Sequence, residues 1–449
     1  MSTPAMNQKH YASDLMRAAE LALDQAKKLG MDQAEVSLHN GTGISLNARQ
    51  QQLETVEKHN DSQLQISVYK DHKTGSASSA DLSDKGVQDT VAAAASIANY
   101  TGADSCFGLA DKDRMAGQEI ELGLYYPWQN DISGLSDLAL QCEQAALQYD
   151  ARISNSEGAA VNTYSGHAVY ANSHGFLSAT QASQHSVSCS VIAGTDSGMQ
   201  RDYWYDSNRD PNQLMPVSEI GEQAARRTVR RLNARKIKST TAPVLFDSTI
   251  AASLIGHLIG AISGGVIYKK ASFLLDQIDQ LVLPKFVTIS EHPHKQGAAR
   301  SAWHDNEGVA TSAVSPIITD GVLQRYVLAS FTARKLKLDS TANSGGVRNL
   351  NVSHTGQNFD ELMGDMRTGL WVTELIGSGI NMLTGDYSRG AAGFWVENGE
   401  VKYPVEEITI AGNLIDMFKN ILAIGTDVDQ RGNIDCGSIL LENMTIAGS

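Results

Sequence analysis

The chain has 449 residues, which is longer than a single ordinary hydrophobic core supports, so we expect two or three domains. Hydrophobic residues make up 42% of it and charged residues 19%, a composition typical of folded proteins that excludes a disordered chain. The formal net charge of −14 makes nucleic acid and acidic membranes unfavourable partners, because most of the surface would repel them.

The cysteines and the apolar segments bear on the cellular compartment. Four cysteines lie far apart and form no C-x-x-C pair: Cys106, Cys142, Cys189 and Cys436. This usage favours reduced thiols in the cytoplasm over a disulfide framework. Residues 1–10 are polar and lack the pattern of a signal peptide, and the apolar run at 250–262 is too short to cross a bilayer. We therefore expect a cytoplasmic protein without membrane contact.

Residues 1–100 are predicted to form an N-terminal helix–meander–helix domain. Apolar residues recur at steps of three and four between Leu15 and Leu29, which predicts a helix that ends at Gly30. Alternation of apolar and polar residues then predicts half-buried antiparallel strands, followed by an alanine-rich second helix. The strands are expected at 36–38, 44–46 and 64–68, the turns at 40–41 and 60–61, and the second helix at 84–100.

The pattern is lost at residues 101–126, which we interpret as a linker, and residues 127–236 are predicted to form a middle α+β domain. Its elements are expected to be helices at 135–149 and 217–234, strands at 168–171, 175–179 and 187–191, and a turn at 172–175.

Residues 237–449 are rich in Gly, Ser, Asn and Thr, which predicts a C-terminal domain of short strands and long loops. The loops are expected at 340–356 and 377–393, a helix at 414–424, and a last strand at 438–446. The fold class is therefore α+β, a mixed multi-domain chain with antiparallel meanders flanked by helices and a β-rich C-terminal domain.

Most familiar catalytic motifs are absent from the sequence. It contains no P-loop, no G-x-G-x-x-G after a strand, no G-x-S-x-G and no H-E-x-x-H. Ser67 and Lys70 fit S-x-x-K, but they lie inside an alternating strand, and we interpret this match as chance. No complete catalytic set follows from motifs alone.

Two short segments carry side chains that could bind a metal or move a proton. His292, His294 and His304 are metal-capable, but no regular spacing supplies further ligands, so a polar loop is the favoured interpretation. Asp305 and Glu307 could form an acid/base or metal cluster, although solvated loop acids are more common.

A basic segment at residues 226–238 contains no acidic residue. Spacing of i,i+4 places several of its charges on one flank of a helix, which could bind phosphate. In so acidic a chain, salt bridges to neighbouring domains are the favoured interpretation. The charges are Arg226, Arg227, Arg230, Arg231, Arg235, Lys236 and Lys238.

An ordered set of phrases in the C-terminal half resembles the PmbA/TldD family. The phrases are DNEGVAT at 305–311, DGVL at 320–323, TARKL at 332–336, TGDYSRG at 384–390, EITIAGNL at 407–414 and CGS at 436–438. The N-terminal helix and meander are similar to the first domain of that family, so the resemblance covers nearly the whole chain.

The resemblance implies a cytoplasmic metallopeptidase built from two homologous subunits, in a family named for maturing a microcin propeptide and for modulating DNA gyrase. The TldD-type subunit of such a pair carries an H-E-x-x-x-H helix, and a downstream cysteine completes its metal site. Unfolded peptide is expected to thread into a cavity between the subunits.

This sequence departs from the family motif at the catalytic positions. Ala252 stands at the first histidine and Ser253 at the glutamate, while His257 and Cys436 remain. Serine cannot serve as the general base, and two ligands are fewer than the three that a catalytic zinc needs. The resemblance thus implies a PmbA/TldE-type subunit with no catalytic residue or metal of its own, whose TldD-type partner carries zinc.

Alternatives stay open at this point. His257 and Cys436 could be an ordinary core histidine and a buried thiol, or parts of a non-standard site in an independently active peptidase. Such a site could use Cys436 as ligand or nucleophile, or borrow His292 and His294. The chain could also form a homodimer, or modulate DNA gyrase without proteolysis.

Overall fold

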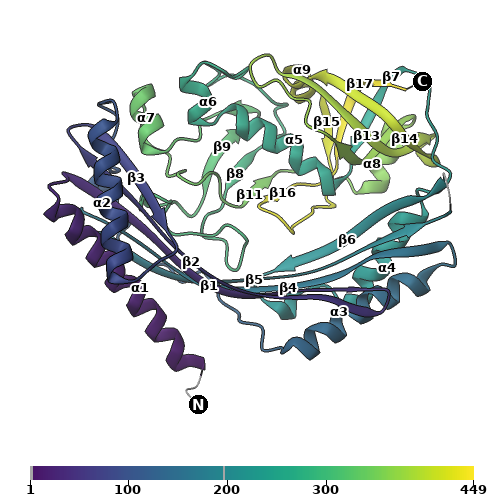
Figure 1. Cartoon of the computed structure of the whole chain (residues 1–449). Helices are drawn as coiled ribbons and strands as arrows, with labels where there is room; N and C mark the ends of the chain where they lie inside the picture. Colours follow the sequence, from purple (N-terminus) through teal and green to yellow (C-terminus); the bar gives the residue numbers. More distant parts are fainter. Residues whose placement is uncertain (1–3, 196–197, 449) are drawn as a thin grey trace.

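The computed structural model describes residues 4–195 and 198–448, and it has the expected α+β class. One large antiparallel sheet forms a floor, with helices α1 to α4 on one face and the C-terminal half of the chain over the other face (Figure 1). The helices of this first part are α1 (Pro4–Lys28), α2 (Asp84–Tyr100), the 3-10 turn η1 (Lys112–Arg114), α3 (Ile132–Tyr149), the 3-10 turn η3 (Pro211–Gln213) and α4 (Val217–Val229).

The floor is a six-stranded sheet in the order β3-β2-β1-β4-β5-β6. Its strands are β1 (Gln33–Arg49), β2 (Gln52–Lys70), β3 (Lys73–Ser79), β4 (Ile153–Asn172), β5 (Leu177–Ala193) and β6 (Gln200–Asn208). The N-terminal and middle segments therefore contribute strands to the same sheet, joined where β1 pairs with β4. The predicted turn at 172–175 is confirmed between β4 and β5.

The turns predicted at 40–41 and 60–61 are wrong, because β1 and β2 run straight through them. Asn40 pairs with Ser62, and the chain instead reverses at Gln50 and Gln51, whose φ angles are 51° and 58°. Gly41 has a different reason to be glycine, since a Cβ there would clash with the ring of Tyr164 on β4.

Alternation along the strands separates the two faces of the floor. Leu38 on β1 packs in one core with α1 and α2, whereas Val187, Cys189 and Val191 on β5 pack in a second core with α3 and α4. Because successive side chains of a strand point to opposite faces, the half-buried serines between these β5 residues face the C-terminal half.

The C-terminal half contains two further sheets around the largest hydrophobic core. One has the order β10-β9-β8-β11-β16, and the other has the order β14-β13-β12-β7-β17-β15, with an added β14–β17 pairing that closes it. The strands of these two sheets are β7 (Thr240–Phe246), β8 (Ile289–Glu291), β9 (Ser315–Thr319), β10 (Val322–Leu323), β11 (Leu350–Val352), β12 (Gly369–Ile376), β13 (Asp386–Glu397), β14 (Glu400–Asn413), β15 (Ile421–Ile424), β16 (Ile434–Asp435) and β17 (Ile439–Ala447).

The helices of this half are α5 (Ser248–Ala261), α6 (Gly264–Tyr268), α7 (Ser330–Leu336), α8 (Phe359–Met366) and α9 (Leu414–Lys419). Three predictions here are wrong in part: residues 350–352 and 386–393, expected in loops, form β11 and begin β13, and residues 421–424, expected in a helix, form β15. In each place pairing with a distant strand decides the structure. No helix in the described part of the chain is long and apolar enough to cross a bilayer.

Candidate functional site

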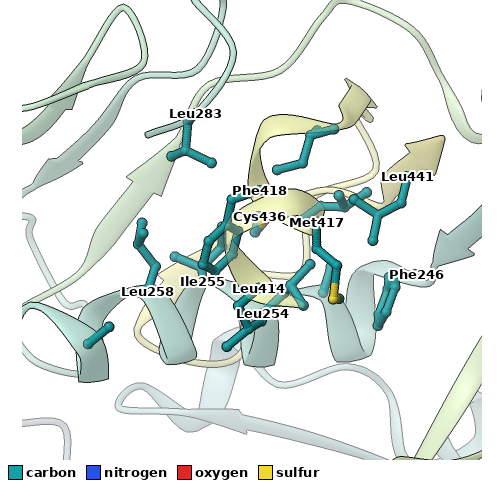
Figure 2. Close-up of a cluster of buried hydrophobic side chains, with 14 of the residues drawn as sticks. Phe246, Leu254, Ile255, Leu258, Leu283, Leu414, Met417, Phe418, Cys436 and Leu441 are labelled. Carbon is teal, nitrogen blue, oxygen red and sulfur yellow. The ribbon is translucent and has the colours of Figure 1, made fainter. Parts of the chain in front are cut away.

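Helix α5 carries the positions of the family motif, and its two faces have different surroundings. Leu254, Ile255 and Leu258 are fully buried and pack into the large C-terminal core (Figure 2). The helix begins at Asp247, whose Oδ1 accepts the backbone N–H of Thr249 at 3.1 Å. An apolar inner face and this cap are sufficient reasons for the segment to be helical.

The other face of α5 presents Ala252, Ser253 and His257, all half-buried. Ala252 offers only a methyl group, which cannot bind a metal. The Ser253 hydroxyl donates a hydrogen bond to the carbonyl of Ile250 at 2.7 Å, so its proton is held by the helix backbone. Neither side chain can take a proton from water at neutral pH.

His257 is a neutral imidazole. Its Nε2 atom is buried without a hydrogen-bond partner among the described residues, and its ring lies edge-on to Tyr387, with ring centroids 6.0 Å apart. Burial lowers the pKa of His257, and the positive charge of Arg389 lowers it further.

Cys436 lies inside the core rather than on the exposed face of α5. Figure 2 shows it among Phe418, Ile255 and neighbouring apolar side chains, and its side chain is fully buried. Burial raises the pKa of the Cys436 thiol to about 12, with a further contribution from Asp427. The group is therefore a neutral thiol, and a metal would need the thiolate.

The family positions together supply one neutral imidazole, whereas a catalytic zinc needs about three protein ligands. Within residues 4–195 and 198–448, no three His, Cys, Asp or Glu side chains gather as a metal-binding group. These donors do not fit a catalytic zinc.

A cavity of about 320 Å³ opens in front of Ser253, between α5 and the edge strand β6. Its walls also come from α4, β12, β13 and the segment before β16. Five arginines line it, from segments far apart in the sequence: Arg201, Arg227, Arg231, Arg389 and Arg431. Sequence reasoning missed this cavity, because only Arg227 and Arg231 belong to the basic segment that it singled out.

The basic segment binds the middle part of the chain to the C-terminal half, as the favoured interpretation predicted. Arg231 pairs with Glu374 on β12 at 2.5 Å, and Lys236 pairs with Glu407 on β14 at 2.6 Å. Arg230 stacks over the ring of Trp371 at 4.9 Å. These charges are used within the molecule rather than presented as a stripe for phosphate.

The three loop histidines do not converge on one point. His292 bonds to Ser290 at 2.8 Å and His294 to Thr311 at 3.0 Å, each through Nε2. His304 bonds to Ser178 on β5 at 2.8 Å. Each ring is satisfied by its own neighbour, which is the structure of a polar loop.

Asp305 is buried and Glu307 is half-buried, so the expectation of solvated acids is wrong. Asp305 accepts the backbone N–H groups of Glu307, Val309 and Ser344 at 2.9, 3.0 and 3.0 Å. Glu307 accepts the N–H of Ser330, the first residue of α7, at 3.0 Å. Both carboxylates satisfy backbone donors in a tight loop.

A half-buried glutamate that the sequence did not indicate, Glu35, lies on β1. Glu35 accepts the hydroxyls of Tyr69 and Tyr170 at 2.7 and 2.8 Å. Burial raises the pKa of Glu35, and the negative charge of Glu307 raises it further. Two carboxylates from opposite halves of the chain thus lie near each other under the C-terminal half.

Comparison with known proteins identifies the family. The PmbA/TldA metallopeptidase domain 1 matches residues 34–98, the central domain 125–232 and the C-terminal domain 239–448. The Metalloprotease PmbA of Escherichia coli O157:H7 is 46% identical over 434 residues, 97% of this chain and 96% of that protein. The Metalloprotease PmbA homolog of Haemophilus influenzae is 45% identical over 443 residues, 98% of each chain.

Solved structures agree with this result. A candidate modulator of DNA gyrase from Bacteroides thetaiotaomicron superposes with a TM-score of 0.91 at 28% identity, over 97% of this chain and 99% of that one. TldE from Thermococcus kodakarensis has a TM-score of 0.80 at 20% identity, over 96% and 100% of the chains, which is a likeness of fold. With relatives at such identity along nearly its whole length, the chain belongs to the PmbA/TldD family of metallopeptidases.

Proposed function

We propose that this chain is the PmbA/TldE-type, non-catalytic subunit of a cytoplasmic, heteromeric metallopeptidase that acts on unfolded peptides. One observation carries the proposal: α5 keeps its place in the core, while Ala252 and Ser253 stand where a ligand and the general base are required. A TldD-type partner would hold the zinc and cleave the peptide, and this subunit would complete the peptide chamber.

The open face of the floor sheet supports a role in holding peptide. The side chains that β5 directs toward the C-terminal half are mostly small and polar, among them Ser186, Ser188 and Ser190. A cavity of about 450 Å³ lies between this face and the C-terminal half, with His39 on one wall and Trp303 on the other. Small polar walls leave room for an extended chain of varied sequence.

A free strand edge offers a second means of binding peptide. β2 pairs with β3 only from Leu64 to Lys70, so in the described part of the chain residues 52–63 have a partner on one side alone. An extended peptide could add there through backbone hydrogen bonds, which are independent of its side chains. Charged side chains such as Glu54 and Lys58 on this edge disfavour uncontrolled pairing.

The test is cleavage and metal content. The purified chain is assayed on an unfolded peptide alone, with a TldD-type subunit, and with a TldD-type subunit whose catalytic glutamate is replaced by glutamine. We expect cleavage only in the second mixture and no stoichiometric zinc in this chain. Chelator-sensitive cleavage by the chain alone would contradict the proposal.

The same preparation separates the proposal from its rivals. If the chain alone is active and Cys436→Ala abolishes that activity, the chain is an independent peptidase with a non-standard site. The name of the Bacteroides relative suggests another role. A stable complex with DNA gyrase that forms without the TldD-type subunit would favour non-proteolytic modulation.

A further inference from the structure

We propose that the arginine-lined cavity in front of α5 binds a carboxylate group of the peptide. This inference rests on the proposed function in taking the ligand to be a peptide. Of the motif positions on α5, Ser253 forms part of the cavity wall.

The charges around the cavity do not balance. Asp202 pairs with Arg227 at 3.3 Å and with Arg231 at 3.6 Å, and Arg231 also pairs with Glu374. Outside the cavity, two more carboxylates, Asp429 and Glu157, pair with Arg431 at 2.7 Å and with Arg201 at 3.1 Å. Five guanidinium groups thus share four carboxylates among the described residues.

Of the five arginines around the cavity, Arg389 on β13 has no carboxylate partner among the described residues. No described carboxylate lies within ion-pair distance of it, and its Nε atom is buried without a hydrogen-bond partner in the described part of the chain. Arg389 as a whole is half-buried, and a guanidinium held at a cavity wall without a counter-charge points to a negatively charged ligand. Burial lowers the pKa of the nearby His257 imidazole, and the charge of Arg389 lowers it further.

The balance and the size of the cavity favour a monoanion. Arg389 offers one guanidinium without an ion-pair partner among the described residues, which matches a single carboxylate, while Asp202 and Glu374 in the wall would repel a doubly charged phosphate. A volume of about 320 Å³ is at the small end of ligand sites and suits one peptide residue. Thr249, Ser253 and Thr373 in the wall add hydroxyl groups beside the guanidinium fork, which binds carboxylates with two hydrogen bonds.

Serine in place of the motif glutamate also affects the charge of the cavity. A glutamate at position 253 would put a carboxylate into the cavity and neutralise its excess charge. Ser253 removes the base that a catalytic subunit needs and, by the same change, leaves the cavity open to an anion from outside.

The carboxylate could come from the C-terminus of the peptide or from an acidic side chain, and calorimetric titration of the full chain distinguishes the two. The probes are pentaalanine with a free C-terminus, its C-terminal amide, and acetyl-Ala-Ala-Glu-Ala-Ala-amide beside its glutamine analogue. Binding of the free acid alone assigns the C-terminal carboxylate, and binding of the glutamate peptide alone assigns the side chain. Equal binding of each carboxylate peptide and its neutral analogue overturns the inference, as does equally tight binding of inorganic phosphate.

Variants test whether this cavity is the binding site. We expect Arg389→Gln to weaken carboxylate binding at least about tenfold, the loss of one charged hydrogen-bonding partner. The matched control is Arg152→Gln, an exposed arginine paired with Asp150 away from the cavity, which should bind as the parent does. Unchanged binding by a folded Arg389→Gln chain would refute the site.

Ser253→Glu provides a test that keeps every arginine. The new carboxylate should occupy the cavity and abolish binding of peptide carboxylates, and undiminished binding would contradict the inference. Cleavage of an amidated, glutamine-containing peptide by the two-subunit complex is measured separately. If that cleavage occurs but carboxylate binding does not, the inference fails and the proposed function stands; if carboxylates bind but the complex never cleaves, the proposed function fails.

Discussion

Replacing Asp202 tests how strongly the cavity wall depends on its shared carboxylate. The Asp202 side chain is 4% exposed, and those of Arg227 and Arg231 are 9% and 14% exposed, so the group is well shielded from water. Asp202→Asn keeps the shape and a carbonyl oxygen for the N–H of Tyr203, but it removes the negative charge.

The expected loss of unfolding free energy follows from the carboxylate partners that Arg227 and Arg231 keep. Arg231 retains Glu374, whereas Arg227 loses the carboxylate to which it is paired. Removing one partner of a buried pair costs about 3 to 5 kcal/mol, so with one guanidinium left uncompensated we expect about 3 kcal/mol. Glu157→Gln is the control, because its pair with Arg201 is 42% and 58% exposed and should contribute less than about 1 kcal/mol.

The assay is urea unfolding followed by far-ultraviolet circular dichroism and tryptophan fluorescence, with both variants compared at low and high salt. The Asp202→Asn midpoint should fall well below that of Glu157→Gln, and salt should change the difference little, since buried charges are weakly screened. Equal midpoints for the two variants would refute the reasoning that this wall is an electrostatic unit.

Further predictions concern α5, β1 and the cysteines. Leu254→Ala should lower the free energy of unfolding by about 3 kcal/mol because Leu254 is fully buried, while Ser253→Ala should change it by less than about 1 kcal/mol in the same urea assay. Glu35 has a raised pKa, so its stabilising contribution is present below the unfolded pKa of about 4.3 and is lost as pH rises through the folded pKa. The stability of Glu35→Gln relative to the parent should therefore increase between pH 5 and pH 8, and a decrease would be inconsistent with this sign. Cys436, with a pKa of about 12, should react with a thiol reagent roughly 10³-fold more slowly in the folded chain than the partly exposed Cys106, and both should react quickly in denaturant.

Local signals in the sequence sufficed for some elements. The helix predicted at residues 84–100 is observed at Asp84–Tyr100, because Ser83 caps it and an alanine-rich face packs on the sheet. The turns of the first meander were not predictable in this way. The Asn40–Gly41 pair is a strong turn signal, yet Gly41 serves a close approach to Tyr164, a residue on a strand more than a hundred positions away.

The candidate site also has features that the sequence shows and features that only the structure shows. Changes at positions 252 and 253 can be read from the sequence, because they fall within one helical motif. The cavity in front of Ser253 depends on tertiary structure, since β6, α4 and β13, which lie far apart in the sequence, each contribute an arginine to its wall. Asp305 also needed the structure, because only the fold brings the N–H of Ser344 to its carboxylate.

The persistence of α5 shows why membership of this family does not by itself establish catalysis. Core packing of Leu254, Ile255 and Leu258 stabilises the helix, and none of these side chains faces the cavity. The positions that would carry chemistry lie on the opposite face, where substitution costs little stability. Selection on folding therefore preserves the helix whether or not its outer face binds a metal. Within such a family, activity has to be inferred from the side chains around the cavity, and here five of those side chains are arginines.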